Sequence, residues 1–135
     1  MRPFRMASVV LLATFSLLAQ LPAQTSDAAG HGALELTSAL GRKLYALPDD
    51  QAIVAARKNL AADPKSVPLV LKLSQAEAGR RQYREAVATT TQGLAFAPDN
   101  AALYLERGHR ELGLREFKPA MKDLEQATQL APQML

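Results

Sequence analysis

Two stretches of the sequence decide the fold, because they carry the same three marks at the same intervals. They are residues 80–100, RRQYREAVATTTQGLAFAPDN, and residues 114–134, LREFKPAMKDLEQATQLAPQM. In each stretch an aromatic residue is followed by an alanine three positions later, and a proline stands twelve positions after that alanine. This recurrence indicates an internal repeat, which takes precedence over the assignment of single helices.

The repeat has a period of 34 residues. Pro64, Pro98 and Pro132 follow one another at this spacing, and residues 67–100 align without gaps on residues 101–134 with nine identities. An ungapped match over a whole period is hard to produce by chance. The identical pairs are Leu69/Leu103, Leu71/Leu105, Glu77/Glu111, Gly79/Gly113, Arg81/Arg115, Ala86/Ala120, Gln92/Gln126, Ala97/Ala131 and Pro98/Pro132.

Each period favours two helices, and in the last one they are separated near Gly113. The second helix has one stripe of apolar and small residues at helical spacing. Pro119 lies near its start, where a missing N–H costs little, and Pro132 lies beyond its end, where a helix must stop. The stripe consists of Phe117, Ala120, Met121, Leu124, Ala127 and Thr128.

The period and its marked positions resemble the tetratricopeptide repeat family. The signature positions are occupied in the last repeat by Tyr104, Gly108, Phe117, Ala120, Ala127 and Pro132, and in the middle repeat by Val70, Ser74, Tyr83, Ala86, Gly93 and Pro98. The resemblance implies an all-α fold, a right-handed stack of antiparallel helix pairs. In such a stack, small residues let the helices approach closely. The aromatic residue fills the space between one pair and the next, a contact made once per repeat.

An earlier, degenerate copy of the repeat is predicted over residues 33–66. Leu36, Leu40, Ala52 and Ala56 fall on signature positions, whereas Asp49 and Asn59 depart from them. Either Asp49 or Asp50 can cap the helix that follows. We therefore expect a domain over residues 33–135 with about three repeats (33–66, 67–100 and 101–134) and six helices.

The first 23 residues have the three parts of a secretory signal peptide. Arg2 and Arg5 are the only charges, and residues 9–19 form an apolar segment. This segment is shorter than the roughly 18 residues of a confident membrane span. Small residues suited to cleavage stand at Ala19 and Ala23.

A signal peptide over residues 1–23 makes the chain an exported protein, periplasmic if the host is a Gram-negative bacterium. An uncleaved signal that tethers the chain to a membrane is the alternative. Residues 24–32 are small and polar, so we expect a flexible linker there. His31 lies in this linker between two glycines and is interpreted as a solvated side chain.

Composition excludes several function classes. The chain has no Cys, which excludes a thiol nucleophile and a cysteine-ligated metal. Its 16 basic and 13 acidic residues become 14 and 13 once Arg2 and Arg5 are removed, so a nucleic-acid partner is not expected.

Glu106 and Glu111 near His109 are interpreted as charges on a solvated helix face. With no hydrolase, metalloprotease or phosphate-loop motif, we expect no enzyme, no cofactor, no metal and no small-molecule substrate.

The resemblance places partner binding on the surface lined by the first helix of each pair. We expect this groove to hold a peptide or protein segment by apolar anchors. Some of its leucines can equally belong to the core, because the helix phase is uncertain by a residue or two. The candidate partner-binding residues are Leu71, Gln75, Ala78, Leu105, His109 and Leu112.

A second hypothesis comes from the carboxyl-terminal edge of the stack. Leu124, Leu130, Met134 and Leu135 are expected on an uncovered face there. Under this hypothesis the chain is a structural element of an envelope complex, and the face is covered by a second copy or by a partner. A protein-interaction module with a groove is the first hypothesis, and homo-oligomerisation through this edge is the alternative.

Overall fold

The computed structural model describes residues 32–134. The predicted signal peptide, nearly all of the predicted linker, and Leu135 lie outside these residues. The helices within 32–134 are all too short or too polar to span a membrane. In chain order the elements are β1 (Leu34–Thr37), β2 (Lys43–Tyr45), α1 (Gln51–Ala62), α2 (Val67–Gly79), α3 (Tyr83–Phe96), α4 (Ala101–Gly113), α5 (Phe117–Leu130) and a 3₁₀ turn, η1 (Pro132–Met134).

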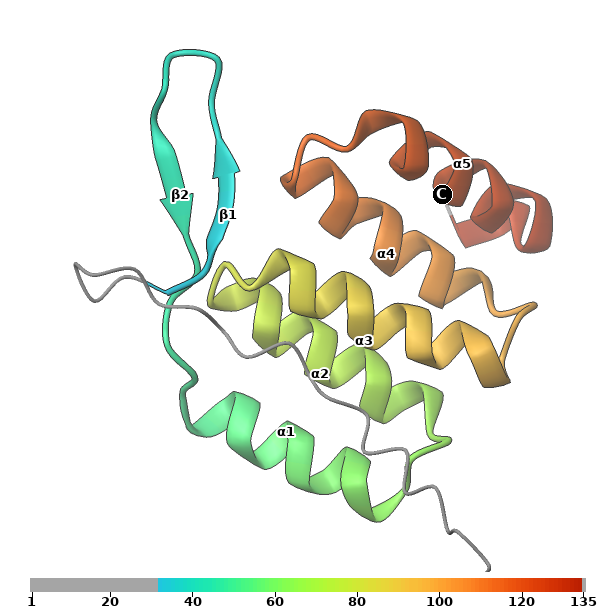
Figure 1. Ribbon diagram of the computed structural model, residues 1–135. Helices are drawn as coiled ribbons and strands as arrows, with labels where there is room; N and C mark the ends of the chain where they lie inside the picture. The colour runs from blue at the N-terminus through green and yellow to red at the C-terminus, as the bar shows by residue number, and fades with distance from the viewer. Residues whose placement is uncertain (1–31, 135) are drawn as a thin grey trace, which may run out of the picture.

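The helices form a stack in which each packs against its neighbour in sequence (Figure 1). The pairs α2–α3 and α4–α5 correspond to the two repeats found at a period of 34, and α2 also contacts α4. The predicted helical repeat fold is therefore confirmed over this part of the chain. Because each pair buries its apolar side only against its neighbours, the order of the helices in the stack follows directly from the repeat.

The turn inside each helix pair has the same geometry in both repeats. Arg81 and Arg115 have φ angles of 58° and 60°, the left-handed region that residues other than glycine seldom adopt. Gln82 N donates to Glu77 O at 2.9 Å, and the equivalent Glu116 N donates to Glu111 O at 2.9 Å. These bonds satisfy carbonyls that the end of α2 or α4 leaves without an intrahelical donor.

Close approach of the helices depends on two glycines. A Cβ on Gly93 of α3 would lie 2.9 Å from Val70 Cγ1 and 3.1 Å from Leu103 Cδ1. One on Gly108 of α4 would lie 3.0 Å from Leu124 Cγ. The small residues predicted at the other close contacts are buried as well: Ala86, Ala120 and Ala127.

The aromatic residue of the middle repeat makes the contact that the repeat predicts. The Tyr83 ring lies against Gly113 at the end of α4, since a Cβ placed there would be 3.4 Å from Tyr83 Cδ1. Tyr83 thus joins one helix pair to the next. Its equivalent, Phe117, is 59% exposed, so the prediction of a buried aromatic is wrong for the last repeat. Within residues 32–134, no later α-helix is present to cover it.

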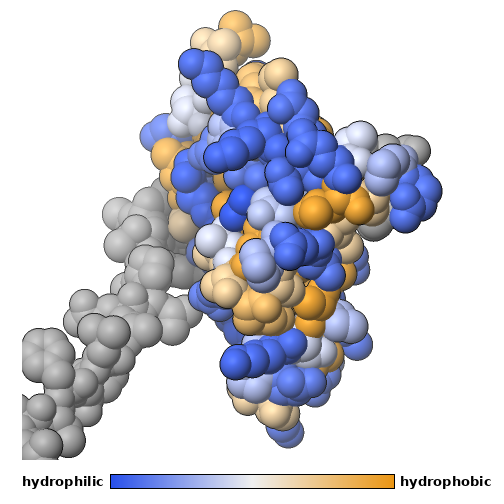
Figure 2. All heavy atoms as spheres, turned by 90° about the vertical axis from the view of Figure 1, so that its right-hand side faces the viewer, coloured by the Kyte–Doolittle hydropathy of each residue, from blue (hydrophilic) through white to orange (hydrophobic). Residues whose placement is uncertain are grey.

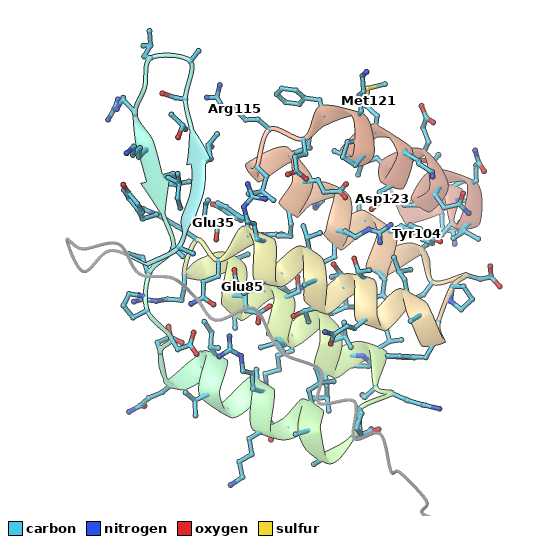
Figure 3. The ribbon with its side chains drawn as sticks, viewed as in Figure 1. Glu35, Glu85, Tyr104, Arg115, Met121 and Asp123 are labelled. Atoms are coloured by element: carbon cyan, nitrogen blue, oxygen red, sulfur yellow. The ribbon has the colours of Figure 1, made fainter. Side chains whose placement is uncertain are left out.

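The predicted apolar stripe of α5 is buried only in part. Ala120 and Ala127 face the stack, and Leu124 is half-buried, whereas Met121 is 60% exposed. Met121 lies on the outer side of α5 in Figure 3. Thr128, which we also placed on the stripe, is exposed. The outer half of the stripe therefore forms a surface on the described part of the chain.

The first half of the predicted degenerate repeat is not a helix. Residues 34–45 form an antiparallel hairpin in which Leu36 pairs with Leu44 and Thr37 with Lys43. Its turn is closed by Ser38 N donating to Arg42 O at 2.8 Å, and Gly41 adopts a positive φ of 75°. A helix cannot continue through that conformation. The chain therefore contributes five helices within 32–134 in place of the six expected.

A buried acid fixes the hairpin to the start of α3. Glu35 is 1% exposed, and its Oε2 accepts from Arg84 N at 3.1 Å, while Arg84 Nη2 donates to Glu35 O at 3.0 Å. The hairpin stands at this end of the helices in Figure 1. A carboxylate there bonds an N–H that the first turn of α3 leaves free. Burial raises the pKa of Glu35 from 4.5 to about 7 although the Arg84 N–H lowers it, and Glu85 raises it further.

The second half of the degenerate repeat is the predicted helix. Asp50 caps α1, because its side chain accepts from Ala52 N at 3.0 Å and from Ile53 N at 3.1 Å. Ile53 and Ala56 of α1 then pack on Leu73 of α2. Asp49, which departs from the repeat signature, is used elsewhere: it accepts from Gln82 Nε2 at 2.8 Å and pairs with Arg57.

Candidate functional site

The first helices of the two complete pairs are directly joined. Ser74 Oγ of α2 donates to Glu106 Oε1 of α4 at 3.0 Å, and both residues are buried. Arg110 Nε lies 3.2 Å from the same Glu106 oxygen. The sequence did not show that Glu106 is buried, and the interpretation of this residue as a solvated charge is wrong. Its hydrogen bond joins α2 directly to α4.

The six predicted partner-binding residues occupy equivalent positions on α2 and α4, which are adjacent. Leu71 and Leu105 are half-buried, and Leu71 packs against the cluster of Val70, Leu94 and Leu103. The two leucines therefore have a partly structural role, as the alternative interpretation of them allowed. The members of the set with exposed side chains are Gln75, His109 and Leu112.

Ala78 differs from the rest of the predicted set. It is 8% exposed, so it offers almost no surface to a partner. The segment between β2 and α1 crosses this end of α2, where Leu47 N donates to Arg80 O at 2.8 Å and Arg80 Nε donates to Pro48 O at 2.9 Å. This crossing could not be foreseen while residues 33–47 were expected to be helical. We therefore remove Ala78 from the candidate surface.

A second candidate site involves a glutamate that recurs in both repeats. In the middle repeat Glu77 is 2% exposed and fully partnered: Thr89 Oγ1 donates to its Oε2 at 2.8 Å, and Arg57 Nη2 donates to its Oε1 at 3.5 Å. Burial raises the pKa of Glu77, while these two partners act in the opposite direction. The acid is thus held between a hydroxyl from α3 and a guanidinium from α1.

The equivalent glutamate in the last repeat has lost both kinds of partner. Glu111 is 6% exposed, and its Oε2 has no hydrogen-bond partner. The residues 34 positions after Thr89 and Arg57 are Asp123 and Thr91, so an acid replaces the hydroxyl and a short side chain replaces the arginine. Burial raises the pKa of Glu111 to about 7. Asp123 and Glu116 raise it further, while Arg107 lowers it.

Asp123 holds Arg107 of α4, the residue that would otherwise be placed to pair with Glu111. Arg107 Nη2 donates to Asp123 Oδ1 at 2.8 Å and its Nε to Oδ2 at 2.5 Å, while Nη1 donates to Thr91 Oγ1 at 3.1 Å. The guanidinium also lies 5.7 Å from the centre of the Tyr104 ring. Because the pairing with Asp123 is bidentate, Arg107 has a fixed orientation and is not free to pair with Glu111.

A hollow of about 390 Å³ opens beside these groups, between α4 and α5. Figure 3 shows Asp123 on α5 facing α4, the helix that carries Tyr104. None of the six predicted partner-binding residues lines this hollow. The residues that line it are Tyr104, Arg107, Glu111, Pro119, Lys122, Asp123 and Gln126.

The hollow was not predicted from the sequence although its signal was present there. Glu77 and Glu111 were recognised as one of nine identical pairs, but this identity was not interpreted as a sign that both glutamates are buried. The informative comparison is between the residues that surround them: Thr89 and Arg57 beside Glu77 are replaced by Asp123 and Thr91 beside Glu111. Across residues 32–134, no group of three or more potential metal ligands is found.

A second, more open hollow of about 660 Å³ lies at the start of α1, and it is lined by Asp49, Asp50, Gln51, Val54, Ala55 and Lys58. On the face seen in Figure 2, hydrophobic residues occur as separate patches between hydrophilic side chains. A mixed surface of this kind is ordinary for a soluble domain, because apolar atoms contribute more than half of most protein surfaces.

Comparison with known proteins agrees with this architecture. No protein-family model matches the chain, and the search of curated proteins gave no match. Among solved structures, the chain is similar to "MamA MSR-1 C2", a structure of MamA, which is a protein with tetratricopeptide repeats. The TM-score is 0.57 at 15% identity, over 62% of this chain and 48% of that chain, so this chain matches about half of the other's length. The likeness shows that the matched part of this chain has a helical repeat fold like that of a protein with tetratricopeptide repeats.

Proposed function

We propose that this chain is a protein-interaction module that holds a segment of a partner polypeptide on the face formed by α2 and α4. The observation that carries this proposal is the direct contact between the two helices. The Ser74–Glu106 bond joins them, and Gln75 on α2 and His109 and Leu112 on α4 are exposed. A segment laid across both helices would meet apolar contacts from Leu112 and polar contacts from Gln75 and His109.

The site of action belongs to the same proposal. The sequence pattern of residues 1–23 is that of a signal peptide, which supports export and, in a Gram-negative host, a periplasmic location. In that compartment the module would serve the assembly of envelope proteins. A membrane-tethered form that keeps its signal segment is the alternative, and both forms expose the α2–α4 face to the same partners.

Site-specific photo-cross-linking tests the proposed face. A photoreactive amino acid in place of His109 is expected to form a covalent adduct with a discrete partner in cells, and the same residue in place of exposed Lys58 on α1 is not. Adding Leu105→Asp to the His109 probe should remove the adduct, because it places a charge on the half-buried part of the face. Equal adducts from both probes, or an adduct that survives Leu105→Asp, would contradict this proposal.

A second candidate function has its own supporting observation. Phe117 and Met121 on α5 are 59% and 60% exposed, whereas their equivalents on α3, Tyr83 and Val87, are half-buried. We propose that a second copy of the chain covers this surface of α5, with Leu124 beneath it. Two α5 helices that pack antiparallel about a two-fold axis would bring Lys118 of one copy opposite Glu125 of the other, at both ends of the contact.

Sedimentation equilibrium distinguishes the two candidates. If α5 mediates self-association, the chain is a dimer at micromolar concentration, and Met121→Asp makes it a monomer. Leu105→Asp should leave the dimer intact while it removes partner capture. A chain that stays monomeric at the highest soluble concentration would rule out the second candidate and leave the first untouched.

A further inference from the structure

The hollow beside Glu111 is the strongest feature that the α2–α4 face does not use. We propose that it is a binding site for a guanidinium group, the arginine side chain of a partner polypeptide, which pairs with the Glu111 carboxylate. This site involves Tyr104, Arg107 and Glu111, whose spacing of three and four places them on a different face of α4 from Leu105 and His109. The proposal therefore does not depend on binding at the α2–α4 face.

The precedent for this ligand lies within the chain. At the equivalent position in the middle repeat, the Glu77 carboxylate accepts from Arg57, a guanidinium supplied by another helix. The repeat thus already uses a buried glutamate to hold an arginine. At Glu111 the chain provides the acid but not the arginine, since Thr91 stands 34 positions after Arg57. The arginine that is missing beside Glu111 indicates that a guanidinium group is the ligand that would fit this site.

Hydrogen bonding gives the same result. Around Glu77 the chain places two carboxylates, Glu77 and Asp49, and one guanidinium, Arg57, which donates to both of them. Around Glu111 it places two carboxylates, Glu111 and Asp123, and one guanidinium, which Asp123 holds in a bidentate pair. The charge of Arg107 lowers the pKa of Glu111, but its guanidinium donates to Asp123 and Thr91, so a second guanidinium would supply the hydrogen bond that Glu111 lacks. Lys122 also lines the hollow, and this residue is exposed.

The hollow also suits the shape of the ligand. Its volume of about 390 Å³ admits an arginine side chain, and Gln126 offers an amide oxygen to a second N–H of the guanidinium. A planar cation can lie against the Pro119 wall while it donates to the carboxylate of Glu111, which also lines the hollow. Binding must displace the proton that this carboxyl holds near neutrality, so a proton competes with the cation.

Titration of the full chain with capped arginine (Nα-acetyl-arginine methylamide), followed by two-dimensional NMR at pH 8, tests the site. We expect saturable shifts at the amides of Glu111, Tyr104 and Gln126. Capped citrulline, which has nearly the same shape without the charge, should cause none. At pH 6 the apparent dissociation constant should rise about tenfold, because a carboxyl that titrates near pH 7 is then mostly protonated. Equal effects of arginine and citrulline, or the absence of shifts at these amides, would overturn the proposal.

Three variants and one further ligand complete the test. Glu111→Gln should abolish the shifts, whereas Glu125→Gln on the exposed side of α5 should leave them unchanged. Thr91→Arg should also abolish them by supplying an internal guanidinium at the position equivalent to Arg57, and persistent binding in that variant would refute the assignment. Agmatine reports on a small-molecule source: if it binds tenfold more tightly than capped arginine, the ligand is not a polypeptide side chain and that part of the proposal fails.

Discussion

Replacing Gly93 by alanine tests whether the helices are as close as the repeat requires. The added methyl group would lie 2.9 Å from Val70 Cγ1 and 3.1 and 3.2 Å from the two Leu103 Cδ atoms. Carbon atoms in contact prefer about 3.5–4.0 Å, so these neighbours must move. Val70 and Leu103 are 2% and 0% exposed, and the branched Val70 has few rotamers, which leaves little room for adjustment.

Two opposing effects set the magnitude. Overpacking a well-filled core typically costs about 1–3 kcal/mol. Alanine gains about 1 kcal/mol over glycine inside a helix. We therefore expect Gly93→Ala to lower the free energy of unfolding by about 1 kcal/mol. Gly79→Ala in α2 is the matched control, because a Cβ there meets nothing within 4 Å. The control should be neutral or stabilising by up to about 1 kcal/mol.

Urea denaturation followed by circular dichroism at the helix band measures both variants. The midpoint should fall for Gly93→Ala and rise or stay unchanged for Gly79→Ala, with an unaltered slope in each case. For a domain of this size, 1 kcal/mol corresponds to a shift of about 4–8 °C in the thermal midpoint. If Gly93→Ala stabilised the chain as much as Gly79→Ala, the close contact between α3 and its neighbours would be refuted.

Three further predictions concern the acids, the turns and the caps. Glu35 and Glu111 bind a proton more tightly in the folded chain, because each has a pKa of about 7 there against an ordinary value of 4.5. The free energy of unfolding should therefore fall as pH rises from about 4.5 to 7. In urea melts at pH 5–8, Glu111→Gln should reduce this dependence on pH and stabilise the chain at pH 8. Arg115→Gly should raise the thermal midpoint, because it removes a left-handed strain of about 1 kcal/mol, and a lower midpoint would contradict the assigned turn. Asp50→Ala should cost about 1 kcal/mol in urea melts through loss of the α1 cap, and an unchanged midpoint would count against that cap.

The sequence predicted the repeating part of the fold because the same contacts recur. The contact of Tyr83 with the next helix pair, the small residues at Gly93 and Gly108, and a cap at Asp49 or Asp50 all follow from patterns with a physical cause. Those patterns are local or periodic, so a single sequence contains enough information to identify them.

The hairpin could not be predicted from the repeat. Residues 33–47 were assigned by extending the 34-residue period backwards, and the leucines at positions 36 and 40 fit helical spacing by coincidence. The decisive features are the left-handed Gly41 and the buried Glu35, which bonds Arg84 from far along the chain. A long-range contact of this kind leaves no local pattern.

The site beside Glu111 was missed for a related reason. A glutamate on a helix is usually solvated, and only the packing of α5 on α4 shows that this one is buried. The exposure of Phe117 is the opposite case: its spacing predicted burial, but burial depends on a neighbouring helix that residues 32–134 do not supply.

The repeat stacking itself is tested most directly by one nuclear Overhauser measurement in solution. The account predicts strong effects between the ring protons of Tyr83 and the α-protons of Gly113, because the ring lies against that backbone across the boundary between helix pairs. Effects from the Tyr83 ring to unrelated residues, with none to Gly113, would show that the two pairs do not stack at the 34-residue period.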